Sequence, residues 1–434
     1  MTLRIVRSDS GRGRRLLERL RRRGDGLLDE RVLKRTRKIV KAVREGGDSA
    51  LLAAVRQYDG VACEAISELR LSSEATADEP LPDGFEGALE RAITAVERYH
   101  REQIHGGCRI EENGVELVER RRPLRRVAVY VPGGRAAYPS TAVMTVIPAR
   151  LAGVEEIAVA TPPGSWQRNP VLRFALERLG VEEVWGMGGA HAVAAFAYGT
   201  ESVRRADKIV GPGNAWVTTA KHLVSGAVAI DSLAGPSEVV IVAGGAADPG
   251  LVAADLLAQA EHDPQALALL VTDHRRLAKA VVKEVDRQLA DLDTAPVATA
   301  SIRDQGAAVV VKDMDEALSW VEEIAPEHLQ LIGDGAEALA ERVDNAAAVF
   351  VGAATPVVFG DYLAGPSHVL PTAGTARFSS ALGVEDFVRR SHQVRFTAAA
   401  AARRAAPAAK LAEIEGLPAH AASARLRMEP GDGG

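Results

Sequence analysis

The sequence contains little cysteine, few aromatic residues and no long apolar run. Its 434 residues include two cysteines, Cys63 and Cys108, which are too few for a disulfide scaffold or a four-cysteine zinc site. The longest apolar stretch, residues 347–360, is shorter than the about 20 residues that a membrane-spanning helix requires. Arg4 and Arg7 interrupt any signal-peptide core at the start of the chain. We therefore expect a protein of a reducing, cytoplasmic setting without a membrane partner.

The charge balance is slightly acidic, and lysine is scarce. The 58 acidic residues outnumber the 53 basic ones, a net charge of −5 that argues against nucleic acid as the main partner. Only nine of the basic residues are lysines, which leaves few candidates for Schiff-base chemistry. Arginines crowd together over residues 14–23, where a nucleic-acid-binding arm is the alternative interpretation. Leucines recur there at helical spacing, so we interpret the segment as a solvated helix face.

Short apolar runs alternate with helical patterns from about Arg126 onward. The first run stops at a Gly/Pro turn after Val131, and the same alternation restarts at Val239. Runs of four to six apolar residues that alternate with helices are typical of parallel α/β units. Because the series occurs twice, the sequence predicts two similar Rossmann-like parallel α/β domains with small helical N- and C-terminal segments.

The expected domain boundaries follow these changes of pattern. We expect an N-terminal helical segment over 1–25, a second α/β domain over 127–237 and a C-terminal helical arm over 381–434. The first α/β domain is expected to combine two separate stretches of the chain, 26–126 and 238–380. The chain would therefore leave the first α/β domain, form the second and return.

The usual fingerprints of nucleotide and acyl chemistry are missing. In Gly186-Met-Gly-Gly-Ala-His191, histidine stands where the third glycine of G-x-G-x-x-G would fall. The sequence has no P-loop and no G-x-S-x-G nucleophile elbow. A nicotinamide cofactor is not excluded by this, but it would have to be held in a less common way.

Glycine-rich turns that carry a polar residue are a better signal. They occupy residues 130–134, 211–214, 234–238 and 364–368. Any one of them alone is more simply a turn, because glycine and proline are the usual turn residues. Ligands of open α/β sheets bind beyond the carboxyl ends of the strands, where we expect these turns to gather. Four such turns in one chain favour a ligand site.

The ten histidines fall into two groups by their surroundings. One group lies in charged helices or loops and is expected to be at the surface or structural: His100, His105, His222, His274 and His392. The other group lies near glycine-rich turns or helix ends: His191, His262, His328, His368 and His420. The second group supplies the candidates for chemistry.

Two short motifs contain such histidines. Gln259 and His262 are three residues apart, on one face of a helix that Asp263-Pro264 is expected to end. An oxygen and an imidazole ligand suit a borderline cation such as Zn²⁺, although the pair alone more often binds no metal. Glu327-His328 offers a carboxylate beside an imidazole, as in a general acid/base pair. The same residues are equally compatible with an ordinary helix N-terminus, where the acid would complement the dipole.

Taken together, the motifs resemble the histidinol dehydrogenase family over most of the chain, from about Gly46 to Arg425. The resemblance rests on long ordered strings. They are YVPGGRAAYPS (130–140), DKIVGPGNA (207–215), AGPSEV (234–239), AQAEHD (258–263), PEHL (326–329), HVLPT (368–372) and EGLPAH (415–420). So many matches in the same order exclude coincidence.

The resemblance implies a set of site residues. One Zn²⁺ per subunit would be bound by Gln259, His262, Asp361 and His420. L-Histidinol would contact those ligands and also Ser237, His328, His368 and Glu415. NAD⁺ would be held by Tyr130, His191 and Asn214, although the family usually has Gln at the position of His191. Neutral histidine still donates or accepts one hydrogen bond there. The sequence also has Ser232-Leu233 where the family usually has Met-Pro, which affects little of the chemistry.

The resemblance also implies an activity and an assembly. The family oxidises L-histidinol to L-histidine through the aldehyde with two NAD⁺, the last two steps of histidine biosynthesis. His328 would accept the alcohol proton, near neutral pH, and Glu327 would activate the water that adds to the aldehyde. The C-terminal tail, with Glu415 and His420, would complete the active site of a partner subunit in a homodimer. Neither cysteine lies in a matching motif, so a thiohemiacetal route is disfavoured.

Two alternatives stay open at this point. Relatives with this scaffold oxidise other alcohols, such as sulfonated diols, and keep the zinc and the Glu-His pair. Glu415 favours a cationic amine over an anionic sulfonate. A catalytically inactive ligand-binding paralogue would lack a ligand or a base, yet every one of those residues is present.

Overall fold

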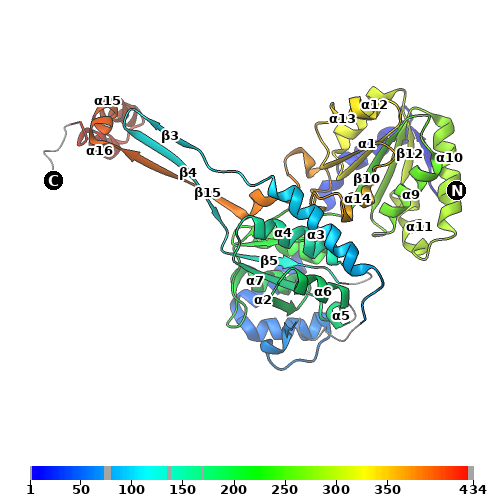
Figure 1. The fold of residues 1–434 in the computed structure, drawn as a ribbon, viewed down its shortest axis with the longest axis horizontal. Helices are drawn as coiled ribbons and strands as arrows, with labels where there is room; N and C mark the ends of the chain where they lie inside the picture. The colour runs from blue at the N-terminus through cyan, green and yellow to red at the C-terminus, as the bar shows by residue number, and fades with distance from the viewer. Residues whose placement is uncertain (1, 73–79, 134–137, 168–169, 429–434) are drawn as a thin grey trace. The chain divides into compact units, whose positions relative to one another are not determined.

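Two sheets of mostly parallel strands, flanked by helices, carry the fold (Figure 1). The computed structural model describes residues 2–72, 80–133, 138–167 and 170–428. Positions 134–137 of the string 130–140 lie outside the described residues. No helix in the described part of the chain is both long and apolar enough to cross a membrane.

The first of the two sheets, called the β10 sheet, is parallel throughout. Its strands, in spatial order, are β1 (Ile5–Arg7), β12 (Ala307–Val310), β11 (Leu267–Thr272), β10 (Glu238–Ala243), β13 (His328–Ile332) and β14 (Ala348–Val351). All residues of β10, β11 and β13 are buried. Helices therefore cover both faces, which is why these strands are apolar runs rather than alternating ones.

The β5 sheet repeats the same arrangement. Its strands, in spatial order, are β2 (Arg70–Leu71), β7 (Glu183–Gly186), β6 (Glu156–Thr161), β5 (Arg126–Tyr130), β8 (Lys208–Val210) and β9 (Ala229–Ile230). In the β10 sheet, β10 is central, with β11 and β12 on one side and β13 and β14 on the other. In the β5 sheet, β5 is central in the same way, with β6 and β7 on one side and β8 and β9 on the other. This is the order of a Rossmann-like sheet. The prediction of two similar parallel α/β domains is confirmed, with one antiparallel edge strand, β2.

The helices connect these strands. They are α1 (Gly11–Arg21), α2 (Glu30–Ala54), α3 (Phe85–Arg101), α4 (Pro139–Leu151), α5 (Pro163–Gln167), α6 (Pro170–Arg178), α7 (Gly189–Tyr198), α8 (Ala215–Val224), α9 (Pro249–Ala260), α10 (Arg275–Leu289), α11 (Ala295–Asp304), α12 (Met314–Ile324), α13 (Ala336–Ala340), α14 (Val357–Tyr362), α15 (Ala398–Ile414) and α16 (Pro418–Arg425). Helix starts follow the expected chemistry. Asp248 caps α9 through Gly250 N and is followed by Pro249, and Asn214 caps α8 through the backbone of Trp216 and Val217.

The chain forms two compact units, and they differ from the expected domains. One unit comprises residues 1–103 and 125–387, with both parallel sheets, and the other comprises 104–124 and 388–434. The second unit contains an antiparallel sheet of β3 (Arg109–Glu112), β4 (Val115–Pro123) and β15 (Val388–Phe396), together with α15 and α16.

The expected assignment of 26–126 to the first α/β domain is therefore corrected. Helix α2 packs against α7 and α8, and β2 pairs with β7, so this stretch up to β2 covers the β5 sheet. Residues 115–123 pair with β15 instead and residues 109–112 pair with 115–118, and the arm begins near Val388 rather than at 381. In the N-terminal segment, β1 joins the β10 sheet beside β12.

The glycine-rich turns do not all lie at carboxyl ends of strands. The turns after β5 and β8 do, at Tyr130 and at residues 211–214. The turn over 234–238 instead precedes β10, so it lies at the opposite edge of its own sheet. His328 begins β13 at that same edge. The candidate residues therefore lie at two separate places: the carboxyl edge of the β5 sheet and the edge of the β10 sheet where β10 and β13 begin.

Candidate functional site

A buried carboxylate–imidazole pair stands at the start of β13. Glu327 Oε2 lies 3.4 Å from His328 Nδ1, and both residues are buried. Ala325, which ends α12, has a left-handed backbone with φ of 47°, a costly conformation for a residue with a side chain. That turn brings the chain from α12 into β13 within three residues. The pair is thus held by a local constraint as well as by the sheet.

Backbone contacts fix the protonation pattern of His328. Its Nδ1 lies 2.9 Å from the carbonyl oxygen of Glu238, the first residue of the neighbouring strand β10. A carbonyl only accepts, so Nδ1 carries the proton and donates it there. The lone pair of a neutral His328 is therefore on Nε2. This nitrogen is the one that can accept a proton from a substrate.

Glu327 is held as an anion by groups on β10 and by His328. Its Oε2 accepts hydrogen bonds from Ser237 Oγ at 2.6 Å and from the backbone N–H of Glu238 at 2.7 Å. Burial alone would raise the pKa of the Glu327 carboxyl, but the charge and hydrogen bond of His328, with these two donors, lower it. Ser237, expected to contact substrate, thus directly orients the acid.

The titration of His328 departs from the expectation of a base near neutral pH. Burial opposes the charged imidazole, yet the charge and hydrogen bond of Glu327, with the charge of Asp361, raise the pKa of His328 to about 9. The physical cause is the anionic partner 3.4 Å away in a water-poor setting. At neutral pH the free protein therefore holds a protonated His328.

Behind this pair lies a buried ion pair that the sequence alone did not reveal. The guanidinium of Arg23 binds the Glu238 carboxylate through Nε at 2.5 Å and Nη2 at 2.7 Å. The same carboxylate accepts from the backbone N–H of Ala373, a second residue with left-handed φ. Glu238 also contacts both Glu327 and His328 through its backbone. One arginine of the basic N-terminal segment therefore supports the Glu327–His328 pair.

Replacing Arg23 by Met is expected to destabilise the protein by roughly 3–5 kcal/mol, because Glu238 would remain a buried charge without its partner. Urea unfolding would measure the loss as a lower midpoint. Arg22→Met is the matched control, since Arg22 forms an exposed pair with Glu18 and should cost about 1 kcal/mol or less. Equal midpoints for the two variants would contradict a structural role for the Arg23–Glu238 pair.

Two predicted metal ligands, Gln259 and His262, lie near the edge of the β10 sheet at which His328 begins β13. Helix α9 runs back between the parallel strands β10 and β11, so its last turn lies where those strands begin. Gln259 is buried in that turn. His262 lies beyond the helix, which ends at Ala260, so the expected placement of both residues on one helix face is corrected. The charges of Asp361 and Glu261 both act on Tyr362, which places the end of α9 close to α14.

Asp361 and His368 lie together beside the acid–imidazole pair. His368 Nδ1 lies 3.0 Å from the carbonyl oxygen of Asp361, so Nδ1 donates and Nε2 is left for a ligand. Although the charges of Asp361 and Glu327 favour its protonation, burial is the largest influence and lowers the pKa of His368. His368 is thus a neutral imidazole, the form that binds metals or donates and accepts hydrogen bonds.

The donor set fits Zn²⁺. Gln259 Nε2 is buried without a hydrogen-bond partner in the described part of the chain, as expected where a further group completes the surroundings of the amide. Two imidazoles and two oxygen ligands match the preferences of Zn²⁺. No group of three or more His, Cys, Asp or Glu residues gathers for a metal within the described residues. Of the four predicted ligands, His420 belongs to the other compact unit.

The two C-terminal site residues are exposed within their own unit. Glu415 is the C-cap residue that follows α15, and His420 lies in the first turn of α16. Glu415 and His420, which the motif 415–420 contains, thus lie on the surface of the smaller compact unit.

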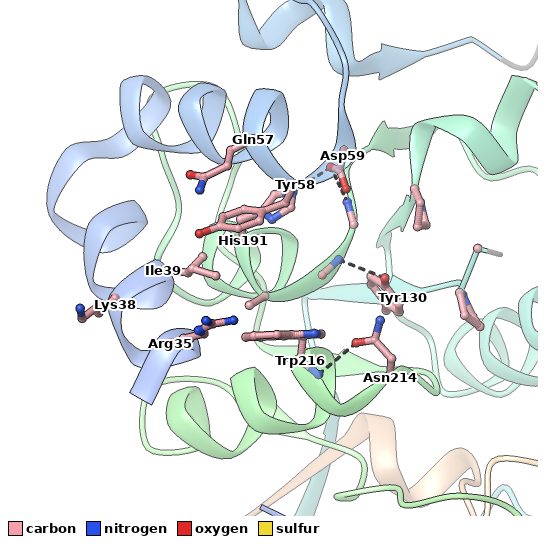
Figure 2. Close-up of a pocket in the computed structure, with 16 residues that line it drawn as sticks. Arg35, Lys38, Ile39, Gln57, Tyr58, Asp59, Tyr130, His191, Asn214 and Trp216 are labelled. Carbon is pink, nitrogen blue, oxygen red and sulfur yellow. Dashed lines mark hydrogen bonds and ion pairs between the residues drawn. The ribbon is translucent and has the colours of Figure 1, made fainter. Parts of the chain in front are cut away.

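The three predicted cofactor residues surround one cavity at the carboxyl edge of the β5 sheet (Figure 2). The cavity has a volume of about 750 Å³ and is lined by Tyr130, His191 and Asn214. Tyr130 OH accepts from the backbone N–H of Gly189 at 3.1 Å, and burial raises the pKa of Tyr130 to about 12. It therefore stays a neutral phenol. The β5 and β8 strand ends that carry Tyr130 and precede Asn214 are neighbours, as the switch point of a Rossmann-like sheet requires.

His191, which replaces the family's usual Gln, has a partner that the sequence did not predict. Its Nε2 lies 2.8 Å from Asp59 Oδ2, and its ring stacks at 6.1 Å on Tyr58. A carboxylate only accepts, so Nε2 carries a proton and Nδ1 of the neutral ring is an acceptor. Asp59 ends a π-helical turn, Val55–Asp59, a rare element that often marks functional positions. His191 is thus fixed in orientation at the cavity.

Two Rossmann-like sheets, a nucleotide-sized cavity on one and a buried acid–imidazole pair on the other define an α/β oxidoreductase. Known proteins identify the family. A family model described as histidinol dehydrogenase matches residues 23–428. A histidinol dehydrogenase of Parasynechococcus marenigrum is 45% identical over 428 residues, with 98% of both chains covered. One of Bacillus cereus is 44% identical over 412 residues, covering 94% of this chain and 95% of the relative.

A solved structure agrees. The crystal structure of histidinol dehydrogenase from Elizabethkingia anophelis matches with a TM-score of 0.88 and 29% identity over 98% of both chains. The chain belongs to the histidinol dehydrogenase family, and the resemblance seen in its motifs is confirmed.

Proposed function

We propose that the protein is a zinc- and NAD-dependent histidinol dehydrogenase. It oxidises L-histidinol to L-histidine through L-histidinaldehyde with two NAD⁺, the last two steps of histidine biosynthesis. The observation that carries this proposal is the buried Glu327–His328 pair, with its proton placed on Nδ1, in a chain of this family. A cytoplasmic location is part of the proposal, supported by two cysteines that are both free.

The site residues divide between the metal, the substrate and the cofactor. Gln259, His262, Asp361 and the partner subunit's His420 would hold Zn²⁺, while Tyr130, His191 and Asn214 would hold NAD⁺. Bound zinc would anchor the imidazole and amine of the substrate, and bound NAD⁺ would accept the hydride of each step. Ser237, His368 and Glu415 would contact the substrate, where the negative charge of Glu415 suits its amine.

The residues of this chain handle the protons. His328 Nε2 would take the proton of the alcohol as the aldehyde forms, because Nδ1 is already committed to the Glu238 carbonyl. Glu327 would take a proton from the water that adds to the bound aldehyde, and His328 would return the alcohol proton to the aldehyde oxygen, giving the hydrate for the second oxidation. Its low pKa keeps the carboxylate ionised for that role, and Ser237 holds it in place.

We propose further that the site is completed by a second copy of the chain. Two surfaces support this. On α15 and α16, Ile414 is 72% exposed and Leu426 82% exposed. Around α14, close to Asp361, Phe359 and Tyr362 are each about half exposed. Large apolar side chains at such exposure are typical of surfaces that another subunit covers.

The yield of NADH per histidinol oxidised tests the proposed reaction. Two equivalents, with histidine as the product, are expected. One equivalent would mean that the reaction stops at the aldehyde. Selective turnover of a sulfonated diol, with no oxidation of histidinol, would favour the alternative that the protein acts on another alcohol.

A further inference from the structure

The cavity on the β5 sheet has an outer wall that the proposed cofactor residues do not explain. Helix α2 packs against α7 and α8 and lines the cavity with Arg35, Lys38 and Ile39. These positions are three and four residues apart, so they share one face of the helix. In Figure 2, Arg35 points toward Trp216, and Lys38 lies at the outer edge. Two cationic side chains of α2 thus line the cavity at the carboxyl edge of the β5 sheet.

Neither cation is neutralised by the protein. Within the described residues, Arg35 and Lys38 form no ion pair and no hydrogen bond, and both are exposed. The lining includes one acid, Asp59, whose Oδ2 is already bound by His191 and by the backbone of Gly188. Unpaired cations at the mouth of a concave site attract anions.

The N-termini of α7 and α8, which border the cavity, have their first N–H groups occupied. At the start of α7, Gly188 N donates to Asp59 at 3.0 Å and Gly189 N donates to Tyr130 OH at 3.1 Å. At the start of α8, Trp216 N and Val217 N both donate to Asn214 Oδ1. In sheets with the glycine fingerprint the pyrophosphate is bound at the turn after the first strand, which here is β5, and this turn lacks the fingerprint. A carboxylate at the start of α7 instead disfavours a phosphate there.

We propose that Arg35 and Lys38 bind the pyrophosphate of the dinucleotide cofactor, so that side chains of α2 supply positive charge for its phosphates. This inference rests on the proposed function for the identity of the cofactor. It explains how a chain without G-x-G-x-x-G holds two phosphates: the positive charge comes from a helix outside the β-α-β unit. Arg35 supplies planar paired donors, and Lys38 supplies a mobile point charge.

Binding of ADP-ribose and adenosine to the full-length protein, followed by calorimetry, tests the proposal. ADP-ribose has the pyrophosphate but no nicotinamide, and adenosine has no phosphate. Arg35→Ala with Lys38→Ala is expected to weaken ADP-ribose and to raise the KM for NAD⁺ by about tenfold or more, with adenosine unaffected. The loss should shrink at high salt, which screens exposed charges. Arg35→Lys with Lys38→Arg should keep most of the affinity.

Lys34→Ala with Arg37→Ala is the matched control, because it removes the same charge from the same helix outside the cavity lining. That variant should bind ADP-ribose like the unmodified protein. Equal losses in the two double variants, or none in either, would overturn the proposal. A loss confined to NADP⁺ would also overturn it, since the cations would then face a ribose 2′-phosphate.

The outcome is separable from that of the proposed function. If the Arg35→Ala/Lys38→Ala variant still oxidises histidinol with an unchanged KM for NAD⁺, the proposed pyrophosphate site is wrong and the proposed function stands. If the protein never oxidises histidinol but binds ADP-ribose through Arg35 and Lys38, only the proposed function is wrong.

Discussion

A mixture of His328→Asn subunits and His420→Ala subunits is expected to regain activity that neither variant has alone. If α16 of each subunit completes the site of its partner, one site of a mixed dimer combines the intact His328 of one chain with the intact His420 of the other. Random mixing would then restore roughly a quarter of the wild-type rate. The measurement is NADH production after the two proteins are unfolded together, refolded and supplied with Zn²⁺.

The reason lies in how the proposed ligands are distributed. Gln259 and Asp361 belong to the unit with the two parallel sheets, whereas His420 belongs to the small unit of β3, β4, β15 and the two C-terminal helices. Three protein ligands from one subunit leave the fourth position to a residue that another copy supplies. Loss of one metal ligand removes most of the affinity, so His420→Ala alone should contain little zinc.

Controls separate assembly from catalysis. Size-exclusion chromatography should show dimers for both variants. A chain ending at Glu413 should stay folded but zinc-poor and inactive, because the unit with the parallel sheets has its own cores. Absence of activity in refolded mixed dimers would show that each site uses its own chain's His420. Full zinc and turnover in the truncated chain would exclude any role for the tail.

The fold was predictable where the apolar pattern is local. Strands such as β10 and β5 are buried on both faces, so each appears in the sequence as an unbroken apolar run. The arm was not predictable in the same way. Its strand β15 pairs with β4 from Val388 opposite Pro123 to Phe396 opposite Val115, across most of the chain, and neither strand is an apolar run. Long-range pairing of polar strands carries no local signal.

The site shows the same division. The motifs identified the acid–imidazole pair, which lies in one short string, and three residues that line one cavity but come from three separate strings. The buried partners Arg23 and Glu238 are 215 residues apart, and Asp59 and His191 are 132 apart. In neither pair does the local sequence around one residue indicate its partner. His100, expected at the surface from its charged neighbours, is instead buried, with a hydrogen bond to Gln103. Ionic partners are set by packing, which only the folded chain reveals.

The His328→Asn variant is expected to lose about 10²–10⁴-fold in kcat, because asparagine cannot accept the alcohol proton. Its zinc content should be unchanged, since His328 is proposed as a base and not as a ligand. Metal analysis beside steady-state kinetics checks both points. A zinc-poor His328→Asn protein would instead make His328 part of the metal site.

The pH dependence identifies the base more sharply. Only neutral His328 accepts a proton. Burial opposes its charge, but Glu327, with the charge of Asp361, raises the pKa of His328 to about 9, so kcat/KM of the wild type should climb with pH and level off near that value. Glu327→Gln removes the anionic partner while burial still disfavours the imidazolium, so the pKa of His328 falls and the limb moves to lower pH. Ser237→Ala is the control, because it removes a hydrogen bond to Glu327 but keeps the charge. A rise of kcat/KM that stays at the same pH in the Glu327→Gln profile would assign the titration to another group, because loss of the Glu327 charge must lower the pKa of His328 even though Asp361 still raises it.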